Sequence, residues 1–329
     1  MIRLALLGFG NVGRAFTHYL LKSGSDAEFS ISAVADVTGG LLLRLGEDIR
    51  RLLEMQDQGR AVADYRDRGT FLDIPEYIHS LKEAGIRVLI ECLPTNPEDG
   101  QPGLSLVQQA LEQGLHVVTA DKGPIVHGHQ LLLEVAQKSG AKLKYSGTTG
   151  VLIPSGVHGC HVLEIRGILN GTTNYILTEM LERDLSFDQA LARAQEQGIA
   201  EPNPALDVQG WDTACKLLIL ANEWMDARAT LDDVLRIGIS SATGELVAEA
   251  RASGRSVRLI GRARRGEGRI RLSVAPRIVQ GESVFHTITG TSKGALFRTR
   301  EKGEVFAGGV SGRDAIAQII LDDVKAVTH

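Results

Sequence analysis

Cysteine is scarce in this chain of 329 residues: three are present, at Cys92, Cys160 and Cys215. They are widely spaced and odd in number, which argues against a disulfide framework and against a cysteine zinc site. This usage is typical of a reducing compartment, and we therefore expect a cytoplasmic protein.

A strong excess of either charge is also lacking. Thirty-six Lys and Arg oppose forty Asp and Glu, for a formal net charge of −4, and no strongly basic stretch occurs. The chain therefore has no general electrostatic reason to bind nucleic acid or an anionic membrane. Long apolar runs are absent too, because glycines interrupt the run Ile2–Leu7 well before the roughly 18 residues of a membrane span. A small-molecule partner is favoured.

What the chain has is enough apolar sequence for a sizeable core, with 43% hydrophobic and 23% charged residues. Short β-rich runs alternate with helical stretches up to about residue 133, which predicts an α/β domain with a doubly wound parallel sheet. Between about residues 140 and 302, strands and helices segregate, which predicts an α+β domain. We expect a first domain at 1–135, completed by 305–329, and a second domain at 136–304.

Three shorter segments carry specific expectations. The polar segment 38–76 should hold a surface helix and a mobile excursion. A helix is expected over Leu231–Ile237 and a strand over Ser283–Thr289.

The turn Gly8–Gly13 reads GFGNVG and lies between an apolar strand and an amphipathic helix. Gly8 suits a tight turn, Gly10 lets the backbone approach a pyrophosphate, and Gly13 lets helix and strand pack closely. Asp36 is at the end of the second strand, where a carboxylate accepts a hydrogen bond from the ribose of NAD. The motif predicts a Rossmann dinucleotide site. The alternatives are a glycine turn with a purely structural use and, for Asp36, a role as a turn residue. The choice between NAD and NADP stays open because three arginines follow, namely Arg44, Arg50 and Arg51.

Two lysines are candidates for chemistry. Lys122 follows the strand His116–Ala120, at a position where open α/β sheets bind ligands, although a plain surface lysine fits as well. Asp212 and Lys216 are four residues apart on an amphipathic helix and share a face with apolar neighbours. This pair is either an acid/base unit in a cleft or a structural ion pair.

The polar turn Asn170–Tyr175 ends a strand and opens a helix. Its residues Thr172, Thr173 or Asn174 either cap that helix or face the same cleft as the lysine. Two histidine pairs, His127 with His129 and His158 with His161, suggest a metal site, but no cluster of carboxylate or cysteine ligands accompanies them, which disfavours zinc.

With these residues in place, the sequence resembles the homoserine dehydrogenase family. The resemblance rests on the GFGNVG turn, on TADKGP at 119–124, on NGTTNY at 170–175 and on the segment from Glu201 to Lys216. It implies a short, homodimeric enzyme without a C-terminal regulatory domain. It also implies NAD(P)-dependent interconversion of L-homoserine and L-aspartate 4-semialdehyde, on the route to threonine, methionine and isoleucine, with a substrate-binding and dimerisation domain at 136–304.

The resemblance also implies roles for individual residues. Lys216 matches the proton donor and acceptor, Asp212 its partner, and Lys122 a second lysine near substrate and nicotinamide, expected to polarise the same substrate oxygen. The residues that match substrate ligands are Glu201, Asp207 and Thr172. The residues that match dinucleotide contacts are Phe9, Asn11, Val12, Thr95 and Gly312, in addition to the glycines of the turn.

Three positions depart from the family pattern. Asp121 replaces a common Asn, Ile199 replaces a common Tyr, and Ser146 stands where many members have a glutamate that binds a monovalent cation. A Na⁺ or K⁺ ion here would have to take most of its oxygens from the backbone, at Thr149, Val151 and Ile153.

Two other functions are weighed against this one. The first half alone would suit an NAD(P)-dependent dehydrogenase of another small hydroxy or amino acid. A dinucleotide-sensing regulator would need a DNA-binding or partner-binding module, and the sequence shows neither a basic patch nor a helix-turn-helix.

Overall fold

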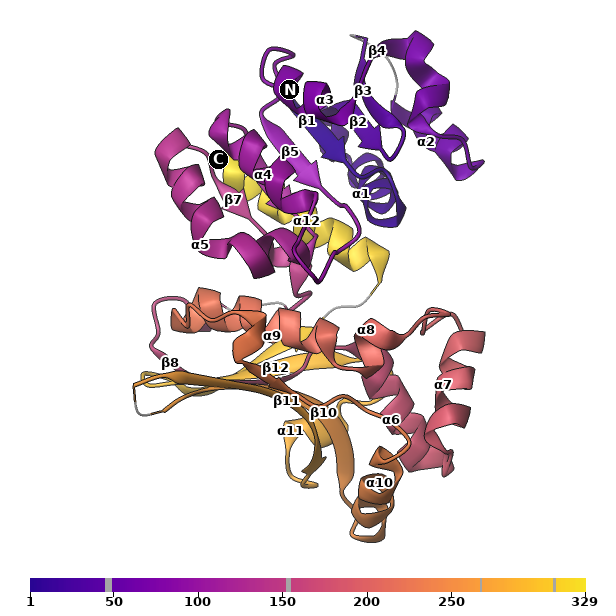
Figure 1. The fold of residues 1–329 in the computed structure, drawn as a ribbon, viewed down its shortest axis with the longest axis vertical. Helices are drawn as coiled ribbons and strands as arrows, with labels where there is room; N and C mark the ends of the chain where they lie inside the picture. The colour runs from indigo at the N-terminus through magenta and orange to yellow at the C-terminus, as the bar shows by residue number, and fades with distance from the viewer. Residues whose placement is uncertain (45–48, 152–154, 267, 310–311) are drawn as a thin grey trace. The chain divides into compact units, whose positions relative to one another are not determined.

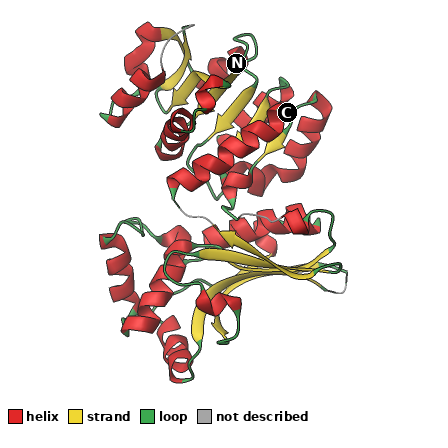
Figure 2. Cartoon of the chain, turned by 180° about the vertical axis from the view of Figure 1, so that it is seen from behind, coloured by secondary structure: helices red, strands yellow, loops and turns green. Residues whose placement is uncertain are grey.

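The computed structural model describes residues 1–44, 49–151, 155–266, 268–309 and 312–329. It divides into two compact units, each with its own sheet: unit 1 is Met1–Thr148 with Gly312–His329, and unit 2 is Thr149–Ser311. Figure 1 shows the chain coloured along its length, and Figure 2 shows its helices and strands from behind. None of the described helices is long and apolar enough to cross a lipid bilayer.

Unit 1 is built on a seven-stranded sheet with the order β4-β3-β2-β1-β5-β6-β7. Strands β2, β1, β5, β6 and β7 are parallel, whereas β3 and β4 add an antiparallel edge. The strands are β1 (Ile2–Leu7), β2 (Phe29–Asp36), β3 (Gly39–Leu43), β4 (Gly69–Leu72), β5 (Val88–Glu91), β6 (His116–Thr119) and β7 (Leu143–Lys144).

Helices cover both faces of this sheet. They are α1 (Asn11–Lys22), α2 (Ile49–Asp57), α3 (Ile74–Ser80), α4 (Gly103–Glu112), α5 (Lys122–Ser139) and the C-terminal α12 (Arg313–Thr328), with short 3-10 turns η1 (Ser25–Ala27), η2 (Val62–Arg68) and η3 (Ser146–Thr148). Phe16 of α1 and Ile320 of α12 pack with Leu4 and Leu6 of β1 in the main core, where α1 lies against α12. On the other face, the buried hydroxyl of Tyr77 in α3 donates to the carbonyl of Leu6 at 3.0 Å. The expected doubly wound fold is confirmed.

Unit 2 is an α+β unit with a six-stranded mixed sheet of order β13-β12-β8-β10-β11-β9. Its strands are β8 (Val162–Ile168), β9 (Val234–Arg236), β10 (Ser256–Arg265), β11 (Ile270–Val279), β12 (Lys293–Thr299) and β13 (Gly303–Gly309). Its helices are α6 (Gly171–Arg183), α7 (Phe187–Glu196), α8 (Ala205–Val208), α9 (Trp211–Met225), α10 (Thr243–Ala252) and α11 (Val284–Thr287), with 3-10 turns η4 (Ser155–Val157) and η5 (Leu231–Asp233).

Helix α9 lies on one face of this sheet, close to the middle of β10. A side chain placed on Gly261 of β10 would lie 3.4 Å from Thr213 and 3.6 Å from Leu217, both in α9. On the opposite face, Phe285 of α11 packs with Ile260 of β10 in a small apolar cluster.

Two local predictions in unit 2 are wrong. Leu231–Ile237 is not a helix, because Val234 and Leu235 pair in parallel with Leu272 and Ser273 of β11. Ser283–Thr289 is not a strand, because the hydroxyl of Ser283 accepts a hydrogen bond from Phe285 N and starts the short helix α11. Both segments are ambiguous by sequence alone: strand pairing determines the conformation of the first, and a helix cap determines that of the second.

The domain borders differ from the expected ones for reasons of strand pairing. Residues 136–148 stay in unit 1, because β7 adds to β6. Residues 305–309 belong to unit 2, because β13 pairs with β12 along its whole length, so that only α12 returns to unit 1. In the segment 38–76, the described residues form β3, α2, η2, β4 and the start of α3, rather than one helix and an excursion; residues 45–48 lie outside the described part.

One carboxyl group of unit 1, that of Glu91 at the end of β5, is completely buried. Its Oε1 accepts a hydrogen bond from Leu93 N at 2.8 Å, and the hydroxyl of Thr119 donates to its Oε2. Burial, with a contribution from the nearby charge of Asp121, raises the pKa of Glu91 to about 8. The folded protein therefore holds a proton on Glu91 at neutral pH, which the unfolded chain releases.

This proton predicts a pH-dependent stability. Because the pKa of Glu91 is about 8 in the folded state and about 4.5 otherwise, its contribution to stability is complete below pH 4.5 and is lost as the pH rises toward 8. We expect Glu91→Gln to raise the free energy of unfolding at pH 8 by an amount on the order of 2 kcal/mol. Urea unfolding at pH 5, 6.5 and 8 measures it, with the exposed Glu83→Gln as control; parallel pH curves for all three proteins would contradict the prediction.

Candidate active site

Two glycines of the turn after β1 are required by the packing of unit 1. Gly8 has a φ of +98°, and a Cβ on it would lie 2.6 Å from the carbonyl oxygen of Cys92. A Cβ on Gly13 would lie 2.2 Å from the carbonyl oxygen of Gly8. These two positions let β1, β5 and α1 approach each other closely.

Gly10 is different, because the fold itself does not need a glycine there. Its φ is −85°, and a Cβ on it would meet no atom within 4 Å. Helix α1 begins directly after it with no side-chain cap and no acidic residue in the first turn. An open approach to uncapped N–H groups at a helix N-terminus fits a phosphate group.

The other residues expected to contact a dinucleotide are placed in different ways. Phe9 is only 2% exposed and its ring belongs to the core, so its side chain is engaged in packing. Asn11 is exposed and accepts a hydrogen bond from Arg14 at 3.4 Å, and Val12 packs partly against the core. The hydroxyl of Thr95 accepts a hydrogen bond from Lys122 N at 3.3 Å. Gly312 is the N-terminal cap residue of α12, with a φ of +98°.

Asp36 ends β2 and fastens the segments around it. Its Oδ1 accepts hydrogen bonds from the backbone and hydroxyl of Thr38, and its Oδ2 accepts one from Val62 N at 2.8 Å. Arg50 instead pairs with Asp26 at 2.7 Å, before the start of β2. With about 3.3 Å per strand residue, the eight residues of β2 put roughly 25 Å between the two ends. Arg50 is therefore remote from Asp36.

Unit 1 holds two further candidates, in different places. Arg44 follows β3, which runs away from Asp36, since Gly39 pairs with Asp36 and Leu42 with Ala33. Lys122 is the first residue of α5, and Ala120 and Asp121 connect it to the carboxyl end of β6. Its neighbour Asp121 caps α5 by accepting a hydrogen bond from Gly123 N at 2.9 Å, and burial raises the pKa of Asp121.

The second group of candidates gathers in unit 2 around Lys216, on α9. Its Nζ donates to Asp212 Oδ2 at 2.6 Å and to the carbonyl oxygen of Leu169 at 3.1 Å. The two side chains are only 12% and 14% exposed, so the predicted shared face is turned inward. A solvated i,i+4 pair contributes a few tenths of a kcal/mol, whereas a largely buried pair is costly to desolvate. Stability alone therefore does not explain it.

Asp207 joins this pair through Asn170. The Nδ2 of Asn170 donates to Asp207 Oδ1 at 2.6 Å and to Asp212 Oδ2 at 2.8 Å. Burial raises the pKa of Asp207, and the charge of Asp212 adds to the rise; hydrogen bonds from Asn170 and Thr172 and the charge of Lys216 oppose it. The structure thus brings four predicted residues of unit 2 together, namely Thr172, Asp207, Asp212 and Lys216.

Sequence reasoning missed the residue that connects them. None of Thr172, Thr173 and Asn174 caps α6; the cap is Asn170, whose Oδ1 accepts a hydrogen bond from Thr173 N at 2.8 Å. The signal was present in the sequence, because Asn is a preferred cap residue and stands directly before the helix. Asn174 instead donates to the carbonyls of Ile288 and Ser292 and is buried.

Glu201 stands apart from this network. Its side chain is exposed in the loop before α8, and its backbone carbonyl accepts a hydrogen bond from Gln195 at 3.2 Å.

The position of the family's cation ligand has another use in this chain. Both the backbone N–H and the hydroxyl of Ser146 donate to the carboxylate of Asp323 in α12, each at 2.9 Å. Thr149 and Val151 are described, Ile153 lies outside the described residues, and the described part holds no cluster of three His, Cys, Asp or Glu side chains suited to a metal. Because Ser146 carries a hydroxyl that is committed to Asp323 in place of a glutamate, a Na⁺ or K⁺ ion here would have to rest on backbone oxygens, as the sequence predicts.

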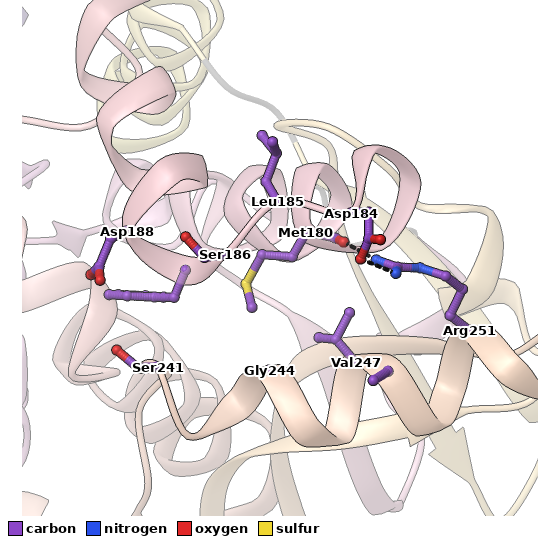
Figure 3. Close-up of a pocket in the computed structure, with 11 residues that line it drawn as sticks. Met180, Asp184, Leu185, Ser186, Asp188, Ser241, Gly244, Val247 and Arg251 are labelled. Carbon is purple, nitrogen blue, oxygen red and sulfur yellow. Dashed lines mark hydrogen bonds and ion pairs between the residues drawn. The ribbon is translucent and has the colours of Figure 1, made fainter.

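A separate cavity of about 160 Å³ lies between the end of α6, the start of α7 and α10 (Figure 3). Arg251 crosses it to the carboxylate of Asp184 and to the last carbonyls of α6, at Met180 and Leu181. Its lining includes none of the residues around Lys216. Arg251 therefore binds the carbonyl groups at the end of α6, and this cavity is distinct from the candidate site.

A doubly wound unit with a phosphate-binding turn, followed by a unit with a largely buried lysine held by a carboxylate and a backbone carbonyl, defines a dinucleotide-dependent dehydrogenase. The comparisons make this class specific. Residues 149–324 match the family model "Homoserine dehydrogenase", and residues 8–146 match "Homoserine dehydrogenase, NAD binding domain". The chain belongs to the homoserine dehydrogenase family.

Individual relatives match this chain over almost its whole length. The homoserine dehydrogenase of Methanocaldococcus jannaschii is 34% identical, covering 98% of this chain and 97% of its own. The NAD(+)-dependent homoserine dehydrogenase of Pseudomonas canavaninivorans is 34% identical, covering 98% and 95%. The crystal structure of a homoserine dehydrogenase from Thiobacillus denitrificans aligns with a TM-score of 0.82 at 26% identity, over 99% of this chain and 73% of that one.

The contrast between Gly10 and Gly13 gives a matched test of the phosphate-binding turn. We expect Gly10→Ala to keep the thermal midpoint of the wild type but to weaken NAD binding at least about tenfold, because a methyl group blocks the close approach of the pyrophosphate. Gly13→Ala should lower the thermal midpoint, because its Cβ meets the carbonyl of Gly8. Isothermal titration with NAD and thermal unfolding measure both; normal NAD binding by a folded Gly10→Ala protein would contradict this assignment.

Proposed function

We propose that this chain catalyses the reaction of its family, the NAD(P)-dependent interconversion of L-homoserine and L-aspartate 4-semialdehyde, in the biosynthesis of threonine, methionine and isoleucine. The observation that carries the proposal is the placement of Lys216, whose ammonium group is held by Asp212 and by the carbonyl of Leu169 in a largely buried network.

Lys216 is proposed to move the proton of the substrate oxygen. Two of the three N–H directions of its ammonium group are assigned to Asp212 and Leu169, which leaves the third for a substrate oxygen. In homoserine oxidation the neutral amine accepts the hydroxyl proton, and in the reverse direction the ammonium group returns it to the aldehyde oxygen. Hydride transfer at the carbinol carbon is the chemistry that the dinucleotide supplies when it is bound.

Asp207 and Thr172 are proposed to hold the amino-acid part of the substrate. The raised pKa of Asp207 reflects a carboxylate that has lost part of its hydration, and a substrate ammonium group would restore a favourable charge partner. Glu201, exposed in the loop before α8, is proposed as a second carboxylate for the same group. These two assignments rest on the family resemblance together with the position of Asp207 in the network.

Lys122 is proposed to polarise the substrate oxygen. Its support is the resemblance and its place at the start of α5, after the carboxyl end of β6, where parallel sheets bind ligands. The dinucleotide itself is assigned to the open turn at Gly10 and the uncapped start of α1. Phe9 would contribute its backbone, since its ring is buried.

For the coenzyme, we propose a preference for NAD over NADP. Asp36 offers a carboxylate at the end of β2, which accepts a ribose hydroxyl and repels a 2′-phosphate. Of the three arginines that left this choice open, Arg50 is paired with Asp26 at the other end of β2 and Arg44 lies toward that end as well. Arg51 is exposed on α2, and its charge acts on Tyr65. Val37, next to Asp36, is 99% exposed and offers an apolar surface for the adenine ring.

We further propose that the chain is a cytoplasmic homodimer, with the sheet of unit 2 as interface. On the face opposite α9, buried Glu164 lies among three partly exposed arginines, namely Arg166, Arg262 and Arg298. Leu235 is 69% exposed and Phe306 43% exposed on the same face. Arginine and large apolar residues are typical of interfaces.

Sedimentation equilibrium should give twice the 35.4 kDa of one chain, and a monomer at micromolar concentration would contradict the dimer.

The reaction itself is tested by the initial rate of nicotinamide reduction with L-homoserine, using NAD and NADP in parallel. We expect turnover with homoserine, faster with NAD, and none with L-serine or L-threonine. Lys216→Ala should lower kcat at least about 100-fold, the lower end of what positioned acid–base groups contribute. Turnover of another hydroxy or amino acid instead of homoserine would support a dehydrogenase of different specificity, and near-normal kcat in Lys216→Ala would refute the proton role.

A further inference from the structure

Asn170 occupies the junction between a helix cap and the proposed catalytic network. It lies after β8 and is the N-terminal cap of α6, where its Oδ1 accepts hydrogen bonds from Thr173 N at 2.8 Å and from the Thr173 hydroxyl at 3.0 Å. It is 4% exposed. The same side chain donates from Nδ2 to two different carboxylates, those of Asp207 and Asp212.

The cap fixes the orientation of the amide. A primary amide has one oxygen that accepts and one nitrogen with two N–H donors. The backbone N–H of Thr173 can only donate, so the amide oxygen must face it and the NH₂ group must face the two carboxylates; a flipped amide would set its oxygen against both carboxylates. Every hydrogen-bonding direction of Asn170 is therefore in use.

This orientation has a consequence for Lys216. Asp212 Oδ2, the oxygen that binds Lys216 Nζ at 2.6 Å, is the same oxygen that accepts from Asn170 at 2.8 Å. The amide therefore selects the carboxylate oxygen that holds the ammonium group. It also neutralises part of the repulsion between Asp207 and Asp212, in agreement with its lowering effect on the pKa of Asp207.

We propose that Asn170 is a positioning residue, whose amide holds Asp207 and Asp212 as a pair of carboxylates and thereby fixes Lys216 for proton transfer. The inference deepens the proposed function and rests on it. The reaction needs one carboxylate to orient the lysine and another to receive the substrate ammonium group. A single neutral donor between them lets both stay ionised at short range.

Cap exchange separates this role from a structural one. Asp and Ser cap helices about as well as Asn, so Asn170→Asp and Asn170→Ser both keep an acceptor for Thr173 N. Neither keeps an NH₂ group between the carboxylates, and Asn170→Asp adds a third negative charge. Ser186→Asp, an exchange of the same kind at the cap of α7, serves as the control that leaves the network untouched.

The experiment measures kcat, KM and thermal midpoints of the full-length variants in aldehyde reduction, in which the ammonium form of Lys216 is the reactive one. We expect kcat to fall about tenfold in Asn170→Ser and at least about 100-fold in Asn170→Asp, as the loss of one or two hydrogen bonds to charged groups suggests. The ratio of Asn170→Asp to wild-type kcat should rise as the pH falls, because the introduced carboxyl group regains a donor when it is protonated. Ser186→Asp should behave as wild type.

Two results would overturn the inference. The first is that both variants have the kcat and KM of the wild type. The second is that both variants lose kcat and thermal midpoint equally, and that the ratio of variant to wild-type kcat does not change with pH, because the loss of the cap alone would give this result. Lys216→Ala, measured in parallel, separates the two proposals. Normal activity of Lys216→Ala would refute the proton role itself, whereas an inactive Lys216→Ala with normal Asn170 variants would refute only the positioning role.

Discussion

The parallel pairing of β1 with its neighbours is the constraint on which the dinucleotide side of this protein depends. Leu7 of β1 pairs with Ala35 of β2 on one side and with Glu91 of β5 on the other. Because parallel strands end at one edge, the phosphate-binding turn, Asp36 and the start of α5 come to the same edge of the sheet. Close packing then demands glycine at Gly8 and Gly13 and leaves Gly10 open for a ligand.

Unit 2 solves a different problem, which is to keep ionised groups close together in a largely buried place. Lys216 gains two acceptors, and the carboxylates of Asp207 and Asp212 share one amide donor. A buried pair of this kind is weak as a source of stability, because desolvation offsets much of the attraction. The free-energy cost of its desolvation is understandable where the charges must act on a bound substrate.

Much of this arrangement could be predicted from local sequence, since the glycine turn and the i,i+4 pair of Asp212 and Lys216 depend on neighbours in the chain. What could not be predicted depends on distant partners. Val234 is a strand residue only because β11 lies beside it, and residues 305–309 join unit 2 only because β12 is available. Asn170 could be recognised as a cap but not as a donor to Asp207, which lies 37 positions away.

Ser146 shows how a local departure from the family pattern is absorbed by the fold. Its N–H and hydroxyl both donate to Asp323, whose pKa is raised by burial and lowered again by these two hydrogen bonds. A glutamate at this position would keep the backbone N–H but would replace the hydroxyl donor with a second carboxylate facing Asp323. Serine and Asp323 therefore form a matched pair, and the segment is fastened to α12 by the protein's own carboxylate. The same logic places Asn170 between two carboxylates, with the donor coming from the chain in both cases.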